Sequence, residues 1–583
     1  MRANGCSRTR DGALVLLGIV CCVASCKDVN ENETAGANVS ARSALLITLD
    51  TTRYDALHAD LDITPVLDGL ARESLSFDAC RTVAPLTLPS HASMLTGLYP
   101  PRHGIRDNGY AALPDELSTL AEHARTAGLR TGAFVAAVVL DRRFGLDQGF
   151  QTYSQPERPE REVTHVYAER PATEVVRDAS TWLRSLEPGE RFFAWVHLFD
   201  PHAPYAPAPE FLERADGDPY LGEIAATDHA VGELLAALRD AGHADTTLVA
   251  VTADHGEDRM QHGEPTHASF CYDTTIQVPM ILHVPGGHRA GERSSATVSV
   301  VDLYPTLLTA LGIGDPGGHD GHDLLQDGQD TRGVYFETYY NFINYGWSPL
   351  VGWADAEGKY IHSSAPELYV TTSDPGERHN TVHSADASRI EAYRRQAAEV
   401  VSQGVERRGS RTDPDDQLTR QLQSLGYAGG VAPTELPSPF DGSDLPAPNK
   451  RVDELHTFLE ASELSDLGRC PEALPLFAKV VDDNPRNRIA LDRYAFCLIQ
   501  GKSWETAARV LRQRIDCGQA SAATHINLGV CLQNLKRPEE AIEHYKQALT
   551  IDPSHKAGRG NLARLLDSLG RSQEAEPYRS EAR

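Results

Sequence analysis

Apolar runs and amphipathic helical patterns alternate along the chain from residue 43 to about residue 383. Runs with the length and composition of buried strands cover residues 44–49, 131–138, 192–198, 247–253, 278–284 and 334–338. Helical patterns lie between them, for example at residues 115–127, 172–186 and 221–241. Such alternation is typical of a sheet that has helices on both faces. The pattern therefore predicts an α/β fold built on one large sheet.

The C-terminal part of the chain keeps a longer period, of 34 residues. Three columns of residues share it: Ala473, Ala507, Ala541 and Ala575; Leu464, Leu498, Leu532 and Leu566; Ala461, Ala495, Gly529 and Ala563. A period of this length, with small residues where helices cross, resembles the tetratricopeptide repeat. The resemblance implies an all-α domain of about four copies over residues 453–583, with a surface for a protein or peptide ligand.

Two further segments separate these regions. Residues 384–430 have a polar helical pattern, which we interpret as a helical extension of the α/β domain. Residues 431–452 contain five prolines, Pro433, Pro437, Pro439, Pro446 and Pro448. A stretch of this composition is typical of a stiff linker.

The N-terminal segment, residues 1–26, has the composition of a targeting signal. Three arginines precede an apolar run at residues 13–20 that is too short to cross a bilayer. The segment ends Val23-Ala24-Ser25-Cys26, which resembles a bacterial lipoprotein lipobox. That resemblance implies lipidation of Cys26, a polar tether over residues 27–42, and a place in the bacterial cell envelope, lipid-anchored to a membrane and extracytoplasmic. An ordinary signal peptide with an incidental cysteine is the alternative.

Composition excludes some partners. The 583 residues carry a net charge of −27 and no block rich in Lys or Arg, so we do not expect nucleic acid as a main partner. Outside the leader, no two cysteines have the spacing of a zinc–thiolate site. A disulfide or two remains open, and the sequence does not set a pairing.

Candidate chemistry lies where the apolar runs end. Asp50 follows the run at 44–49, and Asp254-His255 follow the run at 247–253. Ligands of open parallel sheets bind at this edge. Thr87 stands at the start of a helical pattern, where backbone N–H groups favour an anion. A threonine hydroxyl becomes a useful nucleophile only beside a base or a metal.

We therefore expect Asp50, Thr87, Asp254 and His255 to bind a divalent cation. Three oxygens and one imidazole suit Zn²⁺ or Mn²⁺ somewhat better than Ca²⁺, and one ion or two remain open. The substrate would be an anionic ester, which Thr87 would attack to form a covalent intermediate.

From about residue 43 to residue 383 the chain resembles the sulfatase family of the alkaline-phosphatase superfamily. The resemblance is carried by Asp50–Asp55, Asp200–Tyr205, Ala253–Glu257, Glu367–Tyr369 and Asp374–Glu377. It implies a metal-dependent hydrolase of sulfuric or phosphoric esters on a large mixed, mostly parallel sheet, with a smaller C-terminal subdomain. It also implies that His202 binds substrate.

The chain departs from that family at four positions. Thr87 stands where sulfatases have the Cys or Ser that becomes formylglycine, so we expect no formylglycine here. His91 replaces an arginine, Thr51 replaces the second acidic ligand, and His267 replaces the lysine that contacts sulfate. We expect His91 and His267 to bind substrate, although His202 and His267 could instead contact a second metal ion.

The window from Thr87 to His91, with Thr96–Pro100 and Asn108, resembles nucleotide pyrophosphatase/phosphodiesterases. In that family the threonine is the nucleophile, and the residue at the position of Asn108 helps to bind phosphate. Three hypotheses follow: a sulfatase-family hydrolase, a phosphodiesterase or phosphotransferase of the same superfamily, and a non-catalytic adaptor that displays the repeats.

Overall fold

The computed structural model describes residues 41–58, 61–109, 111–156, 169–326, 332–404, 436–441, 444–518 and 520–579. Cys26 and the N-terminal signal lie outside these ranges, as do nearly all of the expected tether and residues 405–435 of the expected extension and linker. In the described part, no helix combines the length and apolar composition needed to cross a bilayer.

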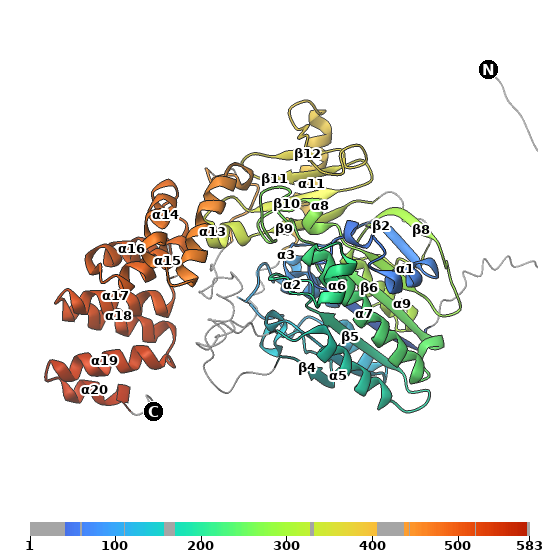
Figure 1. Cartoon of the computed structure of the whole chain (residues 1–583), viewed down its shortest axis with the longest axis horizontal. Coiled ribbons are helices and arrows are strands. Elements are labelled where there is room, and N and C mark those ends of the chain that lie inside the picture. The colour runs from blue at the N-terminus through green and yellow to red at the C-terminus, as the bar shows by residue number, and fades with distance from the viewer. Residues whose placement is uncertain are drawn as a thin grey trace, which may run out of the picture. The chain divides into compact units, whose positions relative to one another are not determined.

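An eight-stranded sheet forms the centre of the α/β domain (Figure 1). Its strand order is β4-β3-β5-β1-β6-β7-β2-β8, and β7 alone runs against its neighbours among these described strands. The strands are β1 (Ser43–Leu49), β2 (Leu75–Arg81), β3 (Arg130–Phe134), β4 (Thr152–Ser154), β5 (Phe192–Leu198), β6 (Thr247–Ala253), β7 (Met280–His283) and β8 (Arg293–Ser299). β1, β5 and β6 are buried along their whole length, which explains their continuous apolar sequence.

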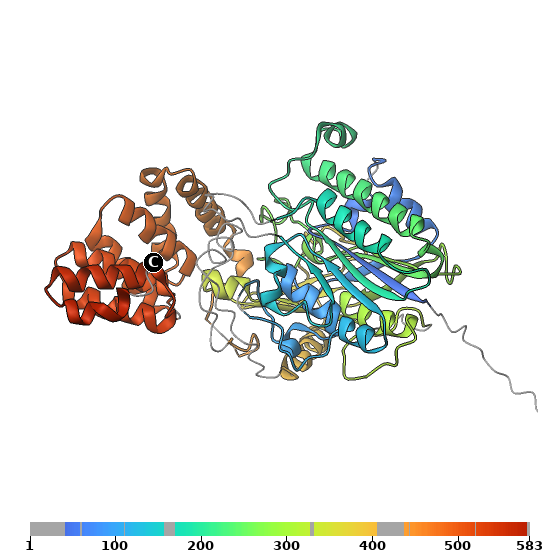
Figure 2. The ribbon, with the colours of Figure 1, turned by 90° about the horizontal axis from the view of Figure 1, so that it is seen from below.

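Helices cover both faces of this sheet, as Figure 2 shows. One layer contains α1 (Pro65–Arg72), α5 (Ala172–Arg184) and α7 (Pro219–Asp240), and the other contains α2 (Thr87–Thr96), α4 (Leu120–Thr126) and α9 (Leu303–Ala310). Shorter helices are α3 (Pro100–His103), α6 (Pro209–Arg214), α8 (Asp273–Ile276) and α10 (Tyr340–Tyr345). The α/β fold with a mixed, mostly parallel sheet is therefore confirmed.

A second, antiparallel sheet follows, of order β12-β11-β10-β9. It consists of β9 (Val334–Thr338), β10 (Leu350–Ala354), β11 (Lys359–His362) and β12 (Glu367–Tyr369), and α11 (Ala387–Ser402) packs beside it. Lys359 of β11 is fully buried, and its Nζ lies 2.8 Å from Asp273 Oδ1 and 2.6 Å from Glu377 Oε1. Arg81 of β2 also binds Asp273, so this buried ion-pair cluster joins the two sheets.

The C-terminal region is all helical, as the 34-residue period predicts. Its helices are α13 (Val452–Asp466), α14 (Cys470–Asp483), α15 (Arg488–Gln500), α16 (Trp504–Asp516), α17 (Ala522–Asn534), α18 (Pro538–Ile551), α19 (Lys556–Ser568) and α20 (Ser572–Arg579). Ala473, Ala507, Ala541 and Ala575 are fully buried between them. A Cβ at Gly529 would lie 2.5 Å from a ring carbon of Tyr545, so this helix crossing requires glycine.

The first repeat is joined to the second by a disulfide, and hydrogen bonds connect it to residues of the α/β domain. A disulfide joins Cys470 of α14 to Cys497 of α15. The described residues from 41 onward belong to one compact unit, and within it Asn484 donates to the Tyr345 carbonyl at 2.8 Å. His456 Nε2 lies 2.7 Å from the carbonyl of Gly263, in the loop that leads to His267.

Candidate active site

The two central strands bring Asp50 and Asp254 together. β1 and β6 are parallel neighbours, and Leu49 is paired with Ala253 at their carboxyl ends. Asp50 and Asp254 each follow by one residue, so both carboxylates leave the sheet at the same edge. Thr87 is the first residue of α2, which approaches this edge from the helical layer.

Three of the predicted ligands surround the Nε2 atom of the fourth, His255. This atom lies 3.3 Å from Thr87 Oγ1, 3.6 Å from Asp50 Oδ1 and 3.6 Å from Asp254 Oδ2. All four residues are buried. Thr87 Oγ1 and one oxygen of each aspartate therefore all lie within 3.6 Å of His255 Nε2.

The donor set fits a divalent cation. His255 Nδ1 lies 3.1 Å from the carbonyl oxygen of Gly256, which can only accept, so Nδ1 bears the proton and the Nε2 lone pair faces the three oxygens. Within the described residues, both oxygens of Asp50 and Oδ2 of Asp254 have no hydrogen-bond donor. Buried carboxylate oxygens without a partner are costly. A cation among them would supply that partner, and the same three residues offer ligand atoms within 4.8 Å of one another.

Burial sets the protonation of this group in the absence of an ion. It raises the pKa of Asp50 to about 7 and, together with the nearby Asp50, raises the pKa of Asp254 to about 7. Burial lowers the pKa of His255 to about 4. The carboxyls therefore retain protons at mildly acidic pH, whereas the imidazole is neutral and able to coordinate a metal.

Asn108 is placed beside the start of α2. Its Oδ1 accepts a hydrogen bond from Leu88 N at 2.9 Å, and its Nδ2 is buried with no acceptor among the described residues. Pro89 has no N–H, and Leu88 N is already bound, so the start of α2 offers an anion fewer free N–H groups than the sequence predicts. Asn108 Nδ2 is therefore a buried donor beside the residue that follows Thr87.

His202 and His267 form an imidazole group next to the metal ligands. The rings of His202 and His267 are 5.2 Å apart, and the ring of His267 is 4.3 Å from that of His255. His267 Nδ1 lies 3.3 Å from Glu257 Oε1. The structure therefore brings both predicted substrate residues to the site, with the Glu257 carboxylate beside them.

His91 is placed differently from the expectation. It is 1% exposed, its Nδ1 lies 2.8 Å from the Thr87 carbonyl oxygen, and its Nε2 lies 3.0 Å from Thr48 Oγ1. Both ring nitrogens thus contact protein atoms behind the ligand set. His197 of β5 lies with Nε2 3.4 Å from Asp50 Oδ2.

Thr51 carries backbone strain at the site. Its φ is +48°, a left-handed value that a β-branched residue rarely adopts. The hydroxyl of Tyr220, from α7, donates to the Thr51 carbonyl at 2.9 Å and stabilises this turn directly after Asp50. Tyr220 has no motif around it, so sequence reasoning has no signal that would identify it.

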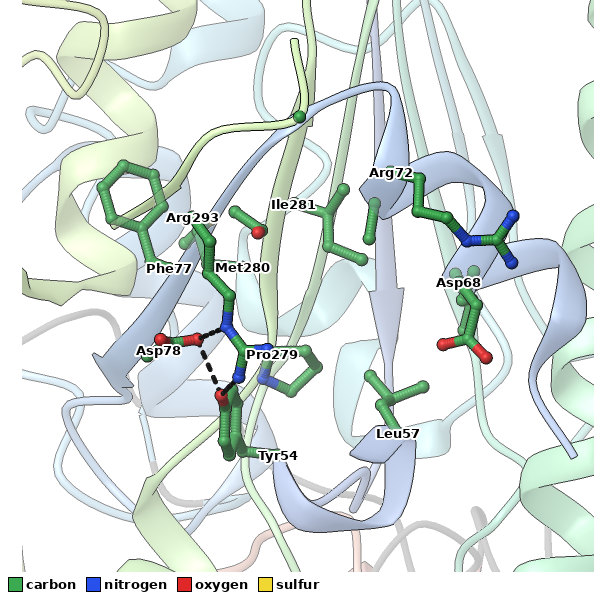
Figure 3. A pocket seen from close by; sticks show the side chains of 14 residues that line it. Tyr54, Leu57, Asp68, Arg72, Phe77, Asp78, Pro279, Met280, Ile281 and Arg293 are labelled. Carbon is green, nitrogen blue, oxygen red and sulfur yellow. Dashed lines mark hydrogen bonds and ion pairs between the residues drawn. The ribbon is translucent and has the colours of Figure 1, made fainter. Parts of the chain in front are cut away.

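A surface hollow lies apart from these residues (Figure 3). Its polar corner contains Tyr54, Asp78 and Arg293, which bind one another: Tyr54 Oη donates to Asp78 at 2.8 Å, and Arg293 donates to both. None of the predicted ligands or substrate residues lines this hollow. We therefore assign it no ligand.

Comparisons with known proteins find matches in both the α/β region and the helical region of the chain. Residues 42–313 match the family model named Sulfatase, and residues 266–403 match that of the C-terminal region of N-sulphoglucosamine sulphohydrolase. Two tetratricopeptide-repeat models match residues 458–522 and 522–555. An ulvan-active sulfatase of Formosa agariphila is 28% identical over 308 residues, which make up 45% of this chain and 60% of that relative.

Two solved structures share the fold. One, determined with its substrate D-glucosamine-2-N,6-O-disulfate, has a TM-score of 0.55 at 20% identity and covers 65% of this chain and 99% of its own. The other, a phosphonate monoester hydrolase of Agrobacterium radiobacter, has a TM-score of 0.53 at 21% identity and covers 62% of this chain and 96% of its own. At these identities the similarity concerns the fold.

Proposed function

Because this chain carries a sulfatase-family domain followed by tetratricopeptide repeats, we propose that it is a metal-dependent hydrolase of sulfate or phosphorus esters. The observation that supports the proposal most directly is the position of Thr87 Oγ1, 3.3 Å from His255 Nε2 and beside the unpartnered oxygens of Asp50 and Asp254. A decayed enzyme fold that serves only as an adaptor would have no need of these four converging groups.

Asp50, Thr87, Asp254 and His255 would hold the cation. A bound divalent ion would favour the alkoxide of Thr87 and withdraw charge from the ester oxygens. The Thr87 oxygen attacks sulfur or phosphorus and forms a new ester bond, while the substrate alcohol departs with its bonding electrons and takes up a proton. Water then cleaves the ester on Thr87, which restores the hydroxyl and releases sulfate or the phosphorus acid.

The surrounding polar groups bind the anion. Asn108 Nδ2 is fixed as the outward donor because its Oδ1 is held by Leu88 N. His202 Nδ1 lies 2.7 Å from the Ala203 carbonyl, so Nδ1 bears the proton and Nε2 is free to accept one. His202 is therefore suited to accept a proton from the attacking water, and His202 and His267 to orient the substrate.

A phosphodiesterase or phosphotransferase is the second candidate. Thr87 favours it, because a plain hydroxyl replaces the residue that sulfatases oxidise to formylglycine, and a phosphoryl-threonine is an ordinary ester. The notable prediction is slow cleavage of a phosphodiester by the unmodified threonine.

An aryl sulfate and an aryl phosphodiester, offered in parallel to purified protein with Mn²⁺ or Zn²⁺, test the proposal. We expect turnover of at least one ester that falls by orders of magnitude in Thr87→Val. Turnover of sulfate alone would eliminate the second candidate. Equal activity in Thr87→Val, or no bound metal in the purified protein, would eliminate the direct nucleophile and favour the adaptor.

We further propose that the protein is anchored by a lipid on Cys26 outside the cytoplasm. The lipobox-like sequence supports this, and so does the Cys470–Cys497 disulfide, because such bonds persist in oxidising compartments. Replacement Cys26→Ser should move the protein from the membrane fraction to the soluble fraction. Tetratricopeptide repeats bind proteins, so a protein or peptide ligand there is part of the same proposal.

A further inference from the structure

Two imidazoles lie behind the four candidate ligands, and the proposed reaction uses neither. His91 of α2 and His197 of β5 are buried, and their ring centroids are 5.0 Å apart. With Asp254 they offer ligand atoms within 4.8 Å of one another, so geometry alone would allow them to bind an ion. The hydrogen bonds of His91 indicate a different role.

The hydrogen bonds of His91 run in one direction. Trp195 Nε1, which can only donate, lies 3.0 Å from Thr48 Oγ1. The Thr48 hydroxyl then has its proton available for His91 Nε2, 3.0 Å away. At the other end, the carbonyl oxygen of Thr87 can only accept, so His91 Nδ1 donates to it at 2.8 Å. The two ends fix a neutral imidazole with its proton on Nδ1.

This chain of bonds connects the strand of one ligand to the helix of another. Thr48 lies two residues before Asp50 on β1, and Thr87 begins α2. His91, four residues after Thr87 on α2, therefore bonds the Thr87 carbonyl within its own helix and Thr48 on the strand that leads to Asp50. Its Nδ1 is 3.8 Å from Asp254 Oδ2, against 2.8 Å from the Thr87 carbonyl, which favours the carbonyl as the partner.

We propose that His91 is a positioning residue that holds Thr87 Oγ1 in the ligand set through the Thr87 carbonyl. The inference rests on the proposed role of Thr87 as ligand and nucleophile. This role replaces the expected substrate contact of His91. It also explains why a histidine can stand where the family pattern has an arginine, because a neutral imidazole links α2 to β1 without adding a fixed positive charge to a buried site.

A double-mutant cycle on metal affinity tests the inference without any ester. Titration calorimetry with Mn²⁺ would compare the wild type, Thr87→Val, His91→Leu and the double variant. We expect His91→Leu to weaken binding by roughly ten-fold, about as much as Thr87→Val, and to add little in the Thr87→Val background. Additive losses, or loss of one ion of two, would make His91 itself a ligand and overturn the inference.

His91→Asn is the conservative variant, because the Asn Nδ2 can donate to the Thr87 carbonyl in place of the imidazole Nδ1. We expect it to retain most of the affinity, and behaviour like that of His91→Leu would overturn the proposed bond. Should His91→Leu not fold, Thr48→Val is the alternative, because it removes the hydroxyl that bonds His91 Nε2. Full metal affinity in that variant would count equally against the inference.

Kinetics separate positioning from substrate binding. We expect kcat of His91→Leu to fall by about 10- to 100-fold at little-changed KM. A raised KM at unchanged kcat would show a substrate contact instead. If the wild type cleaves no ester, the proposed function fails, but the metal-affinity cycle still reports on His91.

Discussion

Thr87 Oγ1 and His255 Nε2 lie 3.3 Å apart, although the residues are 168 positions apart in the sequence. The contact requires the oxygen, and the threonine methyl restricts the rotamer that presents it. We therefore expect Thr87→Ser to bind metal with near wild-type affinity and to lose roughly ten-fold in kcat, measured with whichever ester the wild type cleaves. Thr96→Ser, on the same helix but bound to the Ala92 carbonyl, is the matched control and should be unaffected.

Metal affinity should rise with pH. Burial raises the pKa values of Asp50 and Asp254 to about 7, and a cation must displace their protons. Apparent affinity should therefore increase by ten-fold or more per pH unit below about pH 7 and level off above it. His255, whose pKa is lowered to about 4, releases no proton in this window. Calorimetry in buffers of different ionisation enthalpy measures the protons released.

The same pKa shifts should make the stability of the metal-free protein fall as pH rises, whereas the metal affinity rises. A carboxyl whose folded pKa exceeds its unfolded pKa contributes stability at low pH and loses it as pH rises through the folded value. Asp50→Asn should remove part of this loss near pH 7, as thermal unfolding without metal would show. An affinity that is flat from acidic to neutral pH would contradict both statements.

Two variants should separate the role of the Asn108 amide oxygen from that of its amide nitrogen. Asn108→Asp keeps the acceptor for Leu88 N but removes the buried donor, whereas Asn108→Leu removes both. We expect both variants to lose roughly 100-fold in kcat/KM, because the donor to the ester oxygen is gone. Only Asn108→Leu should also lower the melting temperature, since it leaves Leu88 N without a partner. Full activity of Asn108→Asp would show that the amide does not contact the substrate.

Lys359 should be critical for stability and not for chemistry. Its Nζ lies between Asp273 and Glu377 in the buried cluster that joins the two sheets. Lys359→Met leaves Glu377 without a cation and Asp273 with Arg81 alone, which should lower the free energy of unfolding by about 3–5 kcal/mol in denaturant titration. Lys479→Met, at an exposed position of α14, is the control and should change it by less than about 0.5 kcal/mol.

The Cys470–Cys497 disulfide should stabilise the first repeats. It closes a loop of 27 residues in sequence separation, and constraint of the unfolded chain over such a loop is worth roughly 3.5 kcal/mol. Cys497→Ser should therefore lower the unfolding temperature of the oxidised protein. Thiol titration of denatured protein provides the check: Cys470→Ser should have one more free thiol than the wild type, because it frees Cys497, and one fewer would show that the bond does not form.

The parts of the fold with regular patterns were open to prediction. Continuous apolar runs identify β1, β5 and β6, and the 34-residue columns identify the repeats. β2 and β8 are harder, because Asp78 and Arg81 interrupt the first and exposed polar residues begin the second. The run at 334–338 is a strand as expected, but it belongs to the second sheet, which periodicity does not reveal.

The sequence predicts those site residues that directly follow a strand or begin a helix. Asp50, Asp254 and His255 do so, and Thr87 begins a helix. His91 shows where this reasoning stops, because a residue one helical turn from Thr87 could face either the substrate or the core. Its direction depends on Thr48 and Trp195 of two neighbouring strands, and only the packed sheet and helix reveal that.

The pairing of Leu49 with Ala253 has an evolutionary consequence. Because main-chain bonding between the two central strands sets where Asp50 and Asp254 leave the sheet, their spacing does not depend on long loops or on the neighbouring side chains. Mutation could then exchange Thr87 on α2, or the imidazoles of His202 and His267, while the two aspartates keep their spacing. A scaffold organised in this way can move from one ester chemistry to another by single substitutions.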